Sequence, residues 1–187
     1  GKDESKSLEN TSWIWSPGGE PQTSAAPATN YFRRIVTIPA GRTITSATFQ
    51  YTGDNEGRGW INEFDLGARN SARTVKFNDI TTRLEPGQTY VFGLTGYHNK
   101  AGQPAGVVGS LEIDFSEGPP MIIPTDEHWK VSDHEVPGWL KTNFDDSSWP
   151  VAQKIGPVGM QPWGEVRSAE DRVLPARYLR KEFPVEK

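Results

Sequence analysis

Three tryptophans spaced ten residues apart, Trp129, Trp139 and Trp149, constrain the fold of this chain more than any other feature. The residues between them are rich in turn-forming Asp, Ser, Pro and Gly, and no apolar repeat at helical spacing connects them. The Asp-Asp-Ser-Ser run at residues 145–148 can bond to its own backbone in Asx and Ser turns. Large rings between tight turns indicate short strands around a shared core, so this segment predicts an all-β fold.

Segments with the composition of β-strands recur along the rest of the chain. Residues 44–52 alternate, which places Ala47, Phe49 and Tyr51 on one face. At least six such segments have five to ten residues, and Gly- or Pro-containing turns separate them. This pattern predicts an antiparallel β-sandwich or jelly roll without a helix of three turns. The expected strands are residues 13–15, 30–39, 44–52, 59–66, 74–78, 88–97 and 106–115.

Composition excludes several classes of protein. The chain has 187 residues, enough for one large β domain, and it has no cysteine, which excludes disulfides, thiol catalysis and Cys-ligated zinc. The net charge is −4 and no stripe of Lys and Arg runs among the aromatic residues, so we expect no nucleic-acid partner. No apolar run approaches the roughly 20 residues of a transmembrane helix, so we expect no membrane insertion.

Two segments of the chain have similar sequences, and this similarity bears on domain organisation. Residues 30–39 and residues 176–185 share a Tyr-x-Arg pattern, and each follows a loop containing Pro-Ala. Coincidence between two short strands is the alternative to a repeated opening strand. We expect a disordered tail over residues 1–12 and a β-sandwich domain over residues 13–165. Residues 166–187 are expected to be a linker and the first strand of a following domain that is cut short.

Short motifs follow one another in order from residue 13 to residue 163. They include Trp-Ile-Trp at 13–15, Tyr-Phe-Arg-Arg at 31–34, Asp-Asn at 54–55, Asp-Ile-Thr at 79–81, Ala-Gly-Val-Val-Gly at 105–109, Thr-Asp-x-x-Trp-Lys-Val-Ser at 125–132 and Phe-Asp-Asp-Ser-Ser-Trp at 144–149. In this order they resemble the N-terminal β-sandwich of bacterial α-L-rhamnosidase-type glycoside hydrolases, which has a galactose-binding-domain-like fold. The resemblance implies a carbohydrate partner, a catalytic helical barrel in downstream domains of the same polypeptide, and an extracytoplasmic location, in the periplasm or at the cell surface. The targeting segment would then be absent from this chain.

One position departs from the family pattern. The family has an aromatic residue, a hydrophobic residue and Asn-Gly after the Asp-Asn turn, whereas here Glu63 follows Asn62. Glycine favours the type I′ turn of a tight hairpin. We therefore expect the loop at Asn62 to be longer or differently shaped.

The residue types of a sugar-binding site occur together at residues 53–60, Gly-Asp-Asn-Glu-Gly-Arg-Gly-Trp. An exposed ring can stack on the apolar face of a sugar while Asp, Asn and Arg bond to hydroxyl groups. Residues 96–100 form a second polar loop with one ring. Core packing of Trp60 and a turn role for Asp54 and Asn55 are the alternatives. The candidate carbohydrate-binding residues are Asp54, Asn55, Arg58, Trp60, Asn62 and Tyr97.

Calcium is a possible cofactor, because relatives of such sandwiches often hold a hard cation in their loops. A calcium site needs six to eight oxygen ligands. Asp54, Asn55, Glu56 or Asp79 could contribute, but no loop has the EF-hand pattern. The metal site therefore stays unassigned.

Catalytic motifs are missing from the sequence. There is no Gly-x-Ser-x-Gly elbow and no His-Glu-x-x-His motif, and the three histidines lie far apart. Glycoside hydrolysis needs two carboxyl groups across the sugar, but adjacent residues of a strand point to opposite faces. For Asp145 and Asp146 we expect turn capping. We predict that none of the residues of this chain is catalytic.

Three hypotheses of function follow. The first is a noncatalytic carbohydrate-binding module of an exported glycoside hydrolase. The second is a structural sandwich that braces a catalytic domain without binding sugar. The third is an enzyme in its own right, which needs two carboxylates converging in a cleft. Exposure of Trp60 and Tyr97 beside a polar concavity would favour the first over the second.

Overall fold

The chain folds into two packed antiparallel β-sheets, which confirms the predicted all-β sandwich of galactose-binding-like type. The computed structural model describes residues 8 and 10–167. A short 3-10 helix, η2 (Thr81–Arg83), follows β6. The strands are β1 (Ser12–Trp15), β2 (Ala28–Thr37), β3 (Ile44–Asp54), β4 (Glu56–Ile61), β5 (Phe64–Arg69), β6 (Lys76–Asp79), β7 (Thr89–His98), β8 (Gly106–Phe115), β9 (Met121–Pro124), β10 (Lys130–Ser132) and β11 (Gln153–Pro157).

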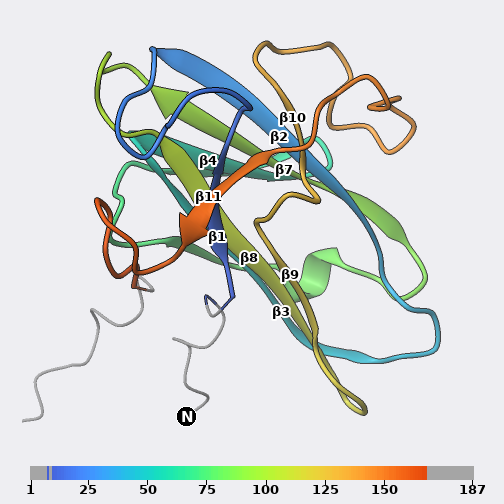
Figure 1. Ribbon diagram of the computed structural model, residues 1–187. Helices are drawn as coiled ribbons and strands as arrows, with labels where there is room; N and C mark the ends of the chain where they lie inside the picture. Colours follow the sequence, from blue (N-terminus) through green and yellow to red (C-terminus); the bar gives the residue numbers. More distant parts are fainter. Residues whose placement is uncertain (1–7, 9, 168–187) are drawn as a thin grey trace, which may run out of the picture.

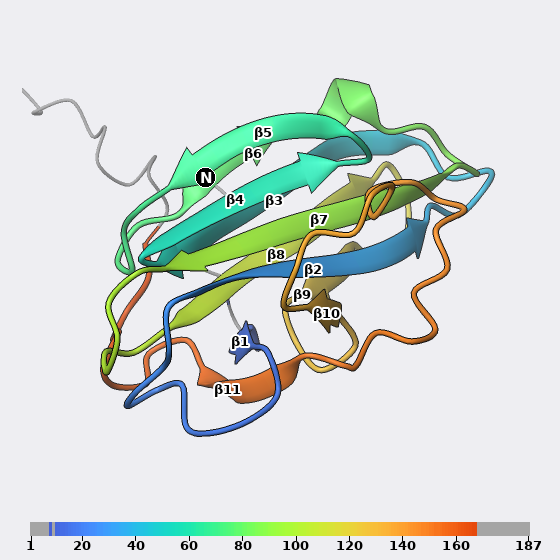
Figure 2. The same ribbon diagram turned by 90° about the horizontal axis from the view of Figure 1, so that it is seen from above.

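The two sheets form the two layers of the sandwich (Figures 1 and 2). The six-stranded sheet has the order β11-β1-β8-β3-β6, and β9 also pairs with β8. The five-stranded sheet has the order β10-β2-β7-β4-β5, and these strands lie side by side in Figure 2. The long strands β3 and β4 follow each other directly but belong to different sheets, so the chain crosses between layers at Asn55.

Alternating apolar side chains from both sheets form the core. Ala47, Phe49 and Tyr51 of β3 are all fully buried, as the alternation predicts. Phe92 of β7 meets Phe49 edge to face across the layers, with ring centroids 5.3 Å apart. Burying such rings removes large apolar areas from water, which is the main stabilising contribution in a domain of this size.

Trp13 and Trp163 belong to a second apolar cluster, whereas Trp129 belongs to the core itself. Trp13 and Trp163 stack with ring centroids 4.3 Å apart, although 150 residues separate them in sequence. Trp129 is fully buried, and its Nε1 donates to the carbonyl of Pro124 at 2.9 Å. Each of these rings therefore ties a turn or terminal segment to the strands.

One expected strand is divided in two, and the expected change at Asn62 concerns the shape of the turn. Residues 59–66 were predicted as one strand, but β4 ends at Ile61 and β5 begins at Phe64. The loop between them has two residues, so it is not longer than a tight hairpin. Asn62 has φ of 48° and Glu63 is not among the residues with positive φ, whereas a type I′ turn needs positive φ at both. The turn therefore differs in shape, as expected, but not in length. The short strands β9, β10 and β11 were not predicted.

The packed region extends beyond the predicted limits of the sandwich at both ends. Leu8 and Val166 are buried with Trp13 and Trp163 in one apolar cluster, and Ser12 opens β1. Apolar contact with the stacked tryptophans explains why these flanking residues pack. The rest of the predicted tail, residues 1–7 and 9, and the predicted linker and strand from residue 168 onward lie outside the described residues. No helix among the described residues is long and apolar enough to cross a membrane.

We predict that Gly59→Ala destabilises the fold. A Cβ at Gly59 would lie 2.2 Å from Cε1 of the buried Tyr51, whose hydroxyl donates to the carbonyl of Gly67 at 2.6 Å. Because that ring has no room to move, the substitution should cost about 1–3 kcal/mol of unfolding free energy, measured by urea denaturation. Arg58→Ala on the same strand removes an exposed ion pair and should change stability by less than about 1 kcal/mol. Equal stability of Gly59→Ala and the wild type would contradict this packing.

Candidate functional site

The outer face of the five-stranded sheet carries the candidate residues. Directly paired residues of antiparallel strands share a face. Tyr97 of β7 pairs with Thr29 of β2 and with Glu56 of β4, and two residues further along, Thr95 pairs with Tyr31 and Arg58. The next row is Arg33, Gly93 and Trp60. Arg58, Trp60 and Tyr97 therefore point to the same side of the sheet.

A long loop covers one half of this face. We call residues 133–150, between β10 and β11, the covering loop; it is orange in Figures 1 and 2. Its Trp139 and Leu140 pack on Gly93, where an added Cβ would lie 2.5 Å from Leu140 Cδ2. Trp139 also meets Tyr31 and Trp60 edge to face, at 5.5 Å in each case. The absence of a side chain at Gly93 lets the loop approach the sheet closely.

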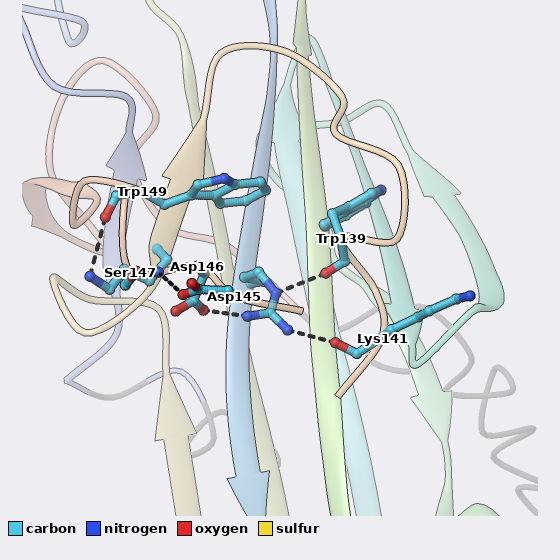
Figure 3. A network of polar contacts seen from close by, with 8 residues as sticks. Trp139, Lys141, Asp145, Asp146, Ser147 and Trp149 are labelled. Carbon is cyan, nitrogen blue, oxygen red and sulfur yellow. Dashed lines mark hydrogen bonds and ion pairs between the residues drawn. The ribbon is translucent and has the colours of Figure 1, made fainter. Parts of the chain in front are cut away.

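Arg33 fixes the covering loop to the sheet. Its side chain is fully buried, and its Nε and Nη2 donate to the carbonyls of Trp139 and Lys141 at 2.8 and 2.9 Å. Nη1 donates to the carboxylate of Asp146, and the guanidinium lies 5.2 Å from the centroid of the Phe144 ring. Figure 3 shows these carbonyl and carboxylate groups converging from the loop. A buried guanidinium is tolerated only when its donors are satisfied in this way.

The adjacent acidic residues Asp145 and Asp146 have different roles. Asp145 Oδ1 accepts the N–H of Ser147 at 3.0 Å, which confirms the predicted turn. The hydroxyl and N–H of Ser147 hold the pKa of Asp145 below its ordinary value, so this carboxylate is ionised at neutral pH. For Asp146 the expected turn capping is replaced by the ion pair with Arg33. Sequence does not reveal that pair, because 113 residues separate its members.

Replacing Arg33 by Lys should detach the covering loop. Lys keeps the charge but cannot reach two carbonyls and a carboxylate in one plane. We expect a loss of about 1–3 kcal/mol of unfolding free energy and a weaker near-ultraviolet circular dichroism signal from the loop tryptophans. Arg34→Lys is the matched control, because Arg34 makes a single, longer contact of 3.5 Å with Asp126, and both side chains are partly exposed. If the two variants are equally stable, Arg33 does not anchor the loop.

The other half of the face stays open around Tyr97. The Tyr97 side chain is 45% exposed, whereas Tyr31 and Trp60 are half-buried against Trp139 of the loop. Beside it, Arg58 forms an ion pair with Asp65 at 2.7 Å, and both side chains are partly exposed. We call Asp54, Asn55, Arg58 and Tyr97 the Tyr97 patch. It combines one accessible ring with charged and amide groups at its edge.

Backbone contacts join the two candidate loops into this one place. The N–H of Asn55 donates to the carbonyl of Tyr97 at 2.9 Å, and Asn55 Oδ1 accepts the N–H of Asn99 at 3.0 Å. Asp54 Oδ2 accepts the indole N–H of Trp163 at 2.9 Å. The two side chains therefore have different neighbours. Asn55 is held against the loop that follows Tyr97, whereas the carboxylate of Asp54 faces Trp163 in the apolar cluster around Trp13.

Two predicted site residues lie apart from Tyr97. Trp60 is half-buried beneath the edge of Trp139, at the border of the covered half. Asn62 lies in the hairpin turn, where its Oδ1 accepts the N–H of Val91 at 2.9 Å. Ile61 pairs with Phe92, five residues from Tyr97, which corresponds to roughly 17 Å along the strand. The structure therefore brings the backbone of Asp54, Asn55 and Arg58 close to Tyr97, with the Asp54 carboxylate turned to Trp163. Trp60 and Asn62 lie further along the sheet.

The chain is similar in sequence and in structure to known carbohydrate-related proteins. No protein-family model matches the chain. An α-L-rhamnosidase of Streptomyces avermitilis is 36% identical over 188 residues, which cover 96% of this chain and 17% of the relative. The crystal structure of Streptomyces avermitilis α-L-rhamnosidase complexed with L-rhamnose has a TM-score of 0.76 and 33% identity, over 85% of this chain and 16% of that one. A lectin from Pleurotus ostreatus in complex with GalNAc has a TM-score of 0.74 and 27% identity, over 86% of this chain and 47% of the lectin chain.

The chain is homologous to the N-terminal region of α-L-rhamnosidases. This confirms the resemblance seen in the ordered motifs. The chain spans about one sixth of the length of the curated relative, so the homology concerns one part of a larger protein. A family GH78 rhamnosidase of Bacillus sp. GL1 shares the fold at a TM-score of 0.69 and 22% identity. The rhamnosidase-like sandwich thus recurs with the same two-sheet architecture.

The described residues supply few ligands for a metal. No group of three or more His, Cys, Asp or Glu residues is placed to hold an ion in the part of the chain that the structure describes. At the Tyr97 patch, one oxygen of Asp54 and the Oδ1 of Asn55 already accept hydrogen bonds. A calcium ion there would need the remaining Asp54 oxygen, Glu56 and several backbone carbonyls. Carboxylates alone therefore do not make a calcium site in this rhamnosidase-like sandwich.

Sequence reasoning missed three residues that shape the patch. Trp163 and Asn99 contact Asp54 and Asn55 directly. Arg33 lies in the row of paired residues next to the row of Arg58, and it fixes the covering loop that borders the patch. The signal that could have indicated Arg33 is its place in the Tyr-Phe-Arg-Arg motif, since an Arg inside a strand of apolar residues needs buried partners. No local spacing could have indicated Trp163 or Asn99.

Proposed function

We propose that this chain is a noncatalytic, glycan-binding accessory module of an α-L-rhamnosidase-type glycoside hydrolase, and that it binds sugar at the Tyr97 patch. The observation that carries the proposal is the exposed Tyr97 ring beside polar groups, on a sheet face whose other rings are covered. A tyrosine ring offers a rigid apolar surface that matches the C–H face of a sugar. The rhamnosidase homology and the likeness to a lectin support this class of ligand.

The polar edge of the patch suits sugar hydroxyls. Asp54 and Asn55 are held by Trp163 and Asn99, so little side-chain entropy would be lost when a ligand binds. Each carboxylate or amide oxygen has a second lone pair that can accept a hydroxyl proton. Arg58 has N–H groups beyond the one bonded to Asp65 and can donate to a hydroxyl or ring oxygen. Donors and acceptors therefore surround the ring on one side.

Further parts of the proposal come from the homology. Catalysis would belong to other domains of the longer polypeptide, and the module would position a plant or bacterial glycan for them. A location outside the cytoplasm is part of the same proposal. A structural brace without affinity for sugar is the competing function, and the test below separates the two.

Tyr97→Ala should abolish glycan binding while leaving the fold intact. The test is a glycan array with the 187-residue chain, with and without calcium, followed by calorimetry on any hit. Loss of the stacking ring should weaken binding at least tenfold. Phe64→Ala is the matched control, because Phe64 is 48% exposed but lies at the hairpin end of β5. Trp60→Ala should weaken glycan binding less than Tyr97→Ala, because Trp60 lies at the border with the covering loop and not beside Tyr97.

The outcomes separate the two functions. Saturable binding that Tyr97→Ala loses and Phe64→Ala retains would support the proposal. Binding that needs calcium would add a cation at the Asp54 end of the patch. A folded chain that binds no glycan in either condition would reject the proposal in favour of the brace.

A further inference from the structure

A second concave site lies on the other side of β2 from Tyr97. It is a pocket of about 630 Å³ between β10, the start of the loop after β1 and the covering loop. Val131, Phe144 and Trp149 provide apolar walls, while Asp133, His134 and Asp145 are among its polar residues. It shares no lining residue with the Tyr97 patch. Its volume lies in the range of small-molecule sites.

The walls of this pocket are fixed in place. Phe144 and Trp149 meet edge to face at 5.5 Å, and the guanidinium of Arg33 lies against the Phe144 ring. The N–H of Val131 donates to the carbonyl of Pro150 at 2.9 Å, and Lys130 Nζ donates to the carbonyl of Trp149 at 3.1 Å. A pocket whose walls are already ordered loses little entropy when a ligand enters.

Charge selects among ligands. None of the described residues that line the pocket is Lys or Arg, whereas Asp133 and Asp145 contribute two carboxylates. Asp133 and His134 are 81% and 73% exposed and bond to each other at 2.8 Å at the mouth of the pocket. The two cations next to the walls are already engaged, Arg33 by Asp146 and Lys130 by the carbonyl of Trp149. The two carboxylates therefore disfavour anions, while neutral groups with hydroxyl donors can bond to them. Apolar rings together with acceptor groups suit a neutral sugar ring.

We propose that this pocket binds one neutral monosaccharide unit, as a second glycan subsite beside the Tyr97 patch. The inference shares with the proposed function only the class of ligand. Because only β2 separates β7, which carries Tyr97, from β10 at the pocket, two units of an extended or branched glycan can occupy the two sites together. Occupancy of both would increase the overall affinity through effective concentration.

The test follows the backbone amide signals of the ¹⁵N-labelled chain during titration with L-rhamnose, N-acetylgalactosamine and D-galacturonate. We expect the signals of residues 132–134 and 144–149 to shift saturably with at least one neutral sugar. The same shifts should occur in Tyr97→Ala. D-Galacturonate should bind the pocket at least tenfold more weakly because of the two carboxylates.

Two variants of the pocket complete the experiment. Ser148→Phe places a ring in the pocket from an exposed position and should remove the shifts at residues 144–149. Asp145→Asn keeps a side-chain acceptor for the N–H of Ser147 but removes one negative charge. It should therefore reduce the difference in affinity between the neutral sugars and D-galacturonate. Should Ser148→Phe fail to fold, the Asp145→Asn result decides.

The result that would overturn the proposal is an absence of pocket shifts with both neutral sugars. Equal shifts in wild type and Ser148→Phe would also overturn it, as would equal binding of D-galacturonate and the neutral sugars. Shifts confined to Tyr97, Asn55 and Asn99 would leave the proposed function standing without the second subsite. Shifts confined to the pocket would support the second subsite and reject sugar binding at the Tyr97 patch.

Discussion

The buried guanidinium of Arg33 makes the contacts on which the candidate binding face depends. Burying an arginine is costly unless all its donors find partners, and here two carbonyls and the Asp146 carboxylate of the covering loop supply them. Detaching the loop would leave these buried donors without partners, and this free-energy cost keeps the loop on the sheet. The loop in turn decides which rings are covered, so Tyr97 remains open while Trp60 lies at the border. The same loop forms the walls of the pocket beside β10.

Most of the fold could be predicted from the sequence because its strands alternate. Ala47, Phe49 and Tyr51 face the core because alternate residues of a strand lie on the same side of the sheet. The exceptions are strands too short to show a period, such as β10 (Lys130–Ser132). Residues 59–66 were predicted as one strand although a changed loop was expected at Asn62, because Asn adopts the positive φ there without a glycine beside it.

The site was predictable only in part, because it is assembled from segments distant in sequence. Residue types indicated Asp54, Asn55, Arg58 and Tyr97, and pairing of β4 with β7 brings the two loops together. Nothing local could show that Trp163 would bond to Asp54 or that Arg33 would bind Asp146. The same limit explains Asn62, which resembled a ligand residue by composition but satisfies the N–H of Val91 in its own turn. Long-range pairing, not residue type, decides which polar groups remain available.

The central claim is that the open half of the five-stranded sheet binds glycan in a frame set by the covering loop. The most direct measurement is a crystal structure of the chain with a sugar identified on the glycan array. The account predicts a sugar ring stacked on Tyr97, with hydroxyl groups in hydrogen-bond contact with Asp54, Asn55 or Arg58 and the covering loop held by Arg33. A sugar bound at neither Tyr97 nor the adjoining pocket would contradict it.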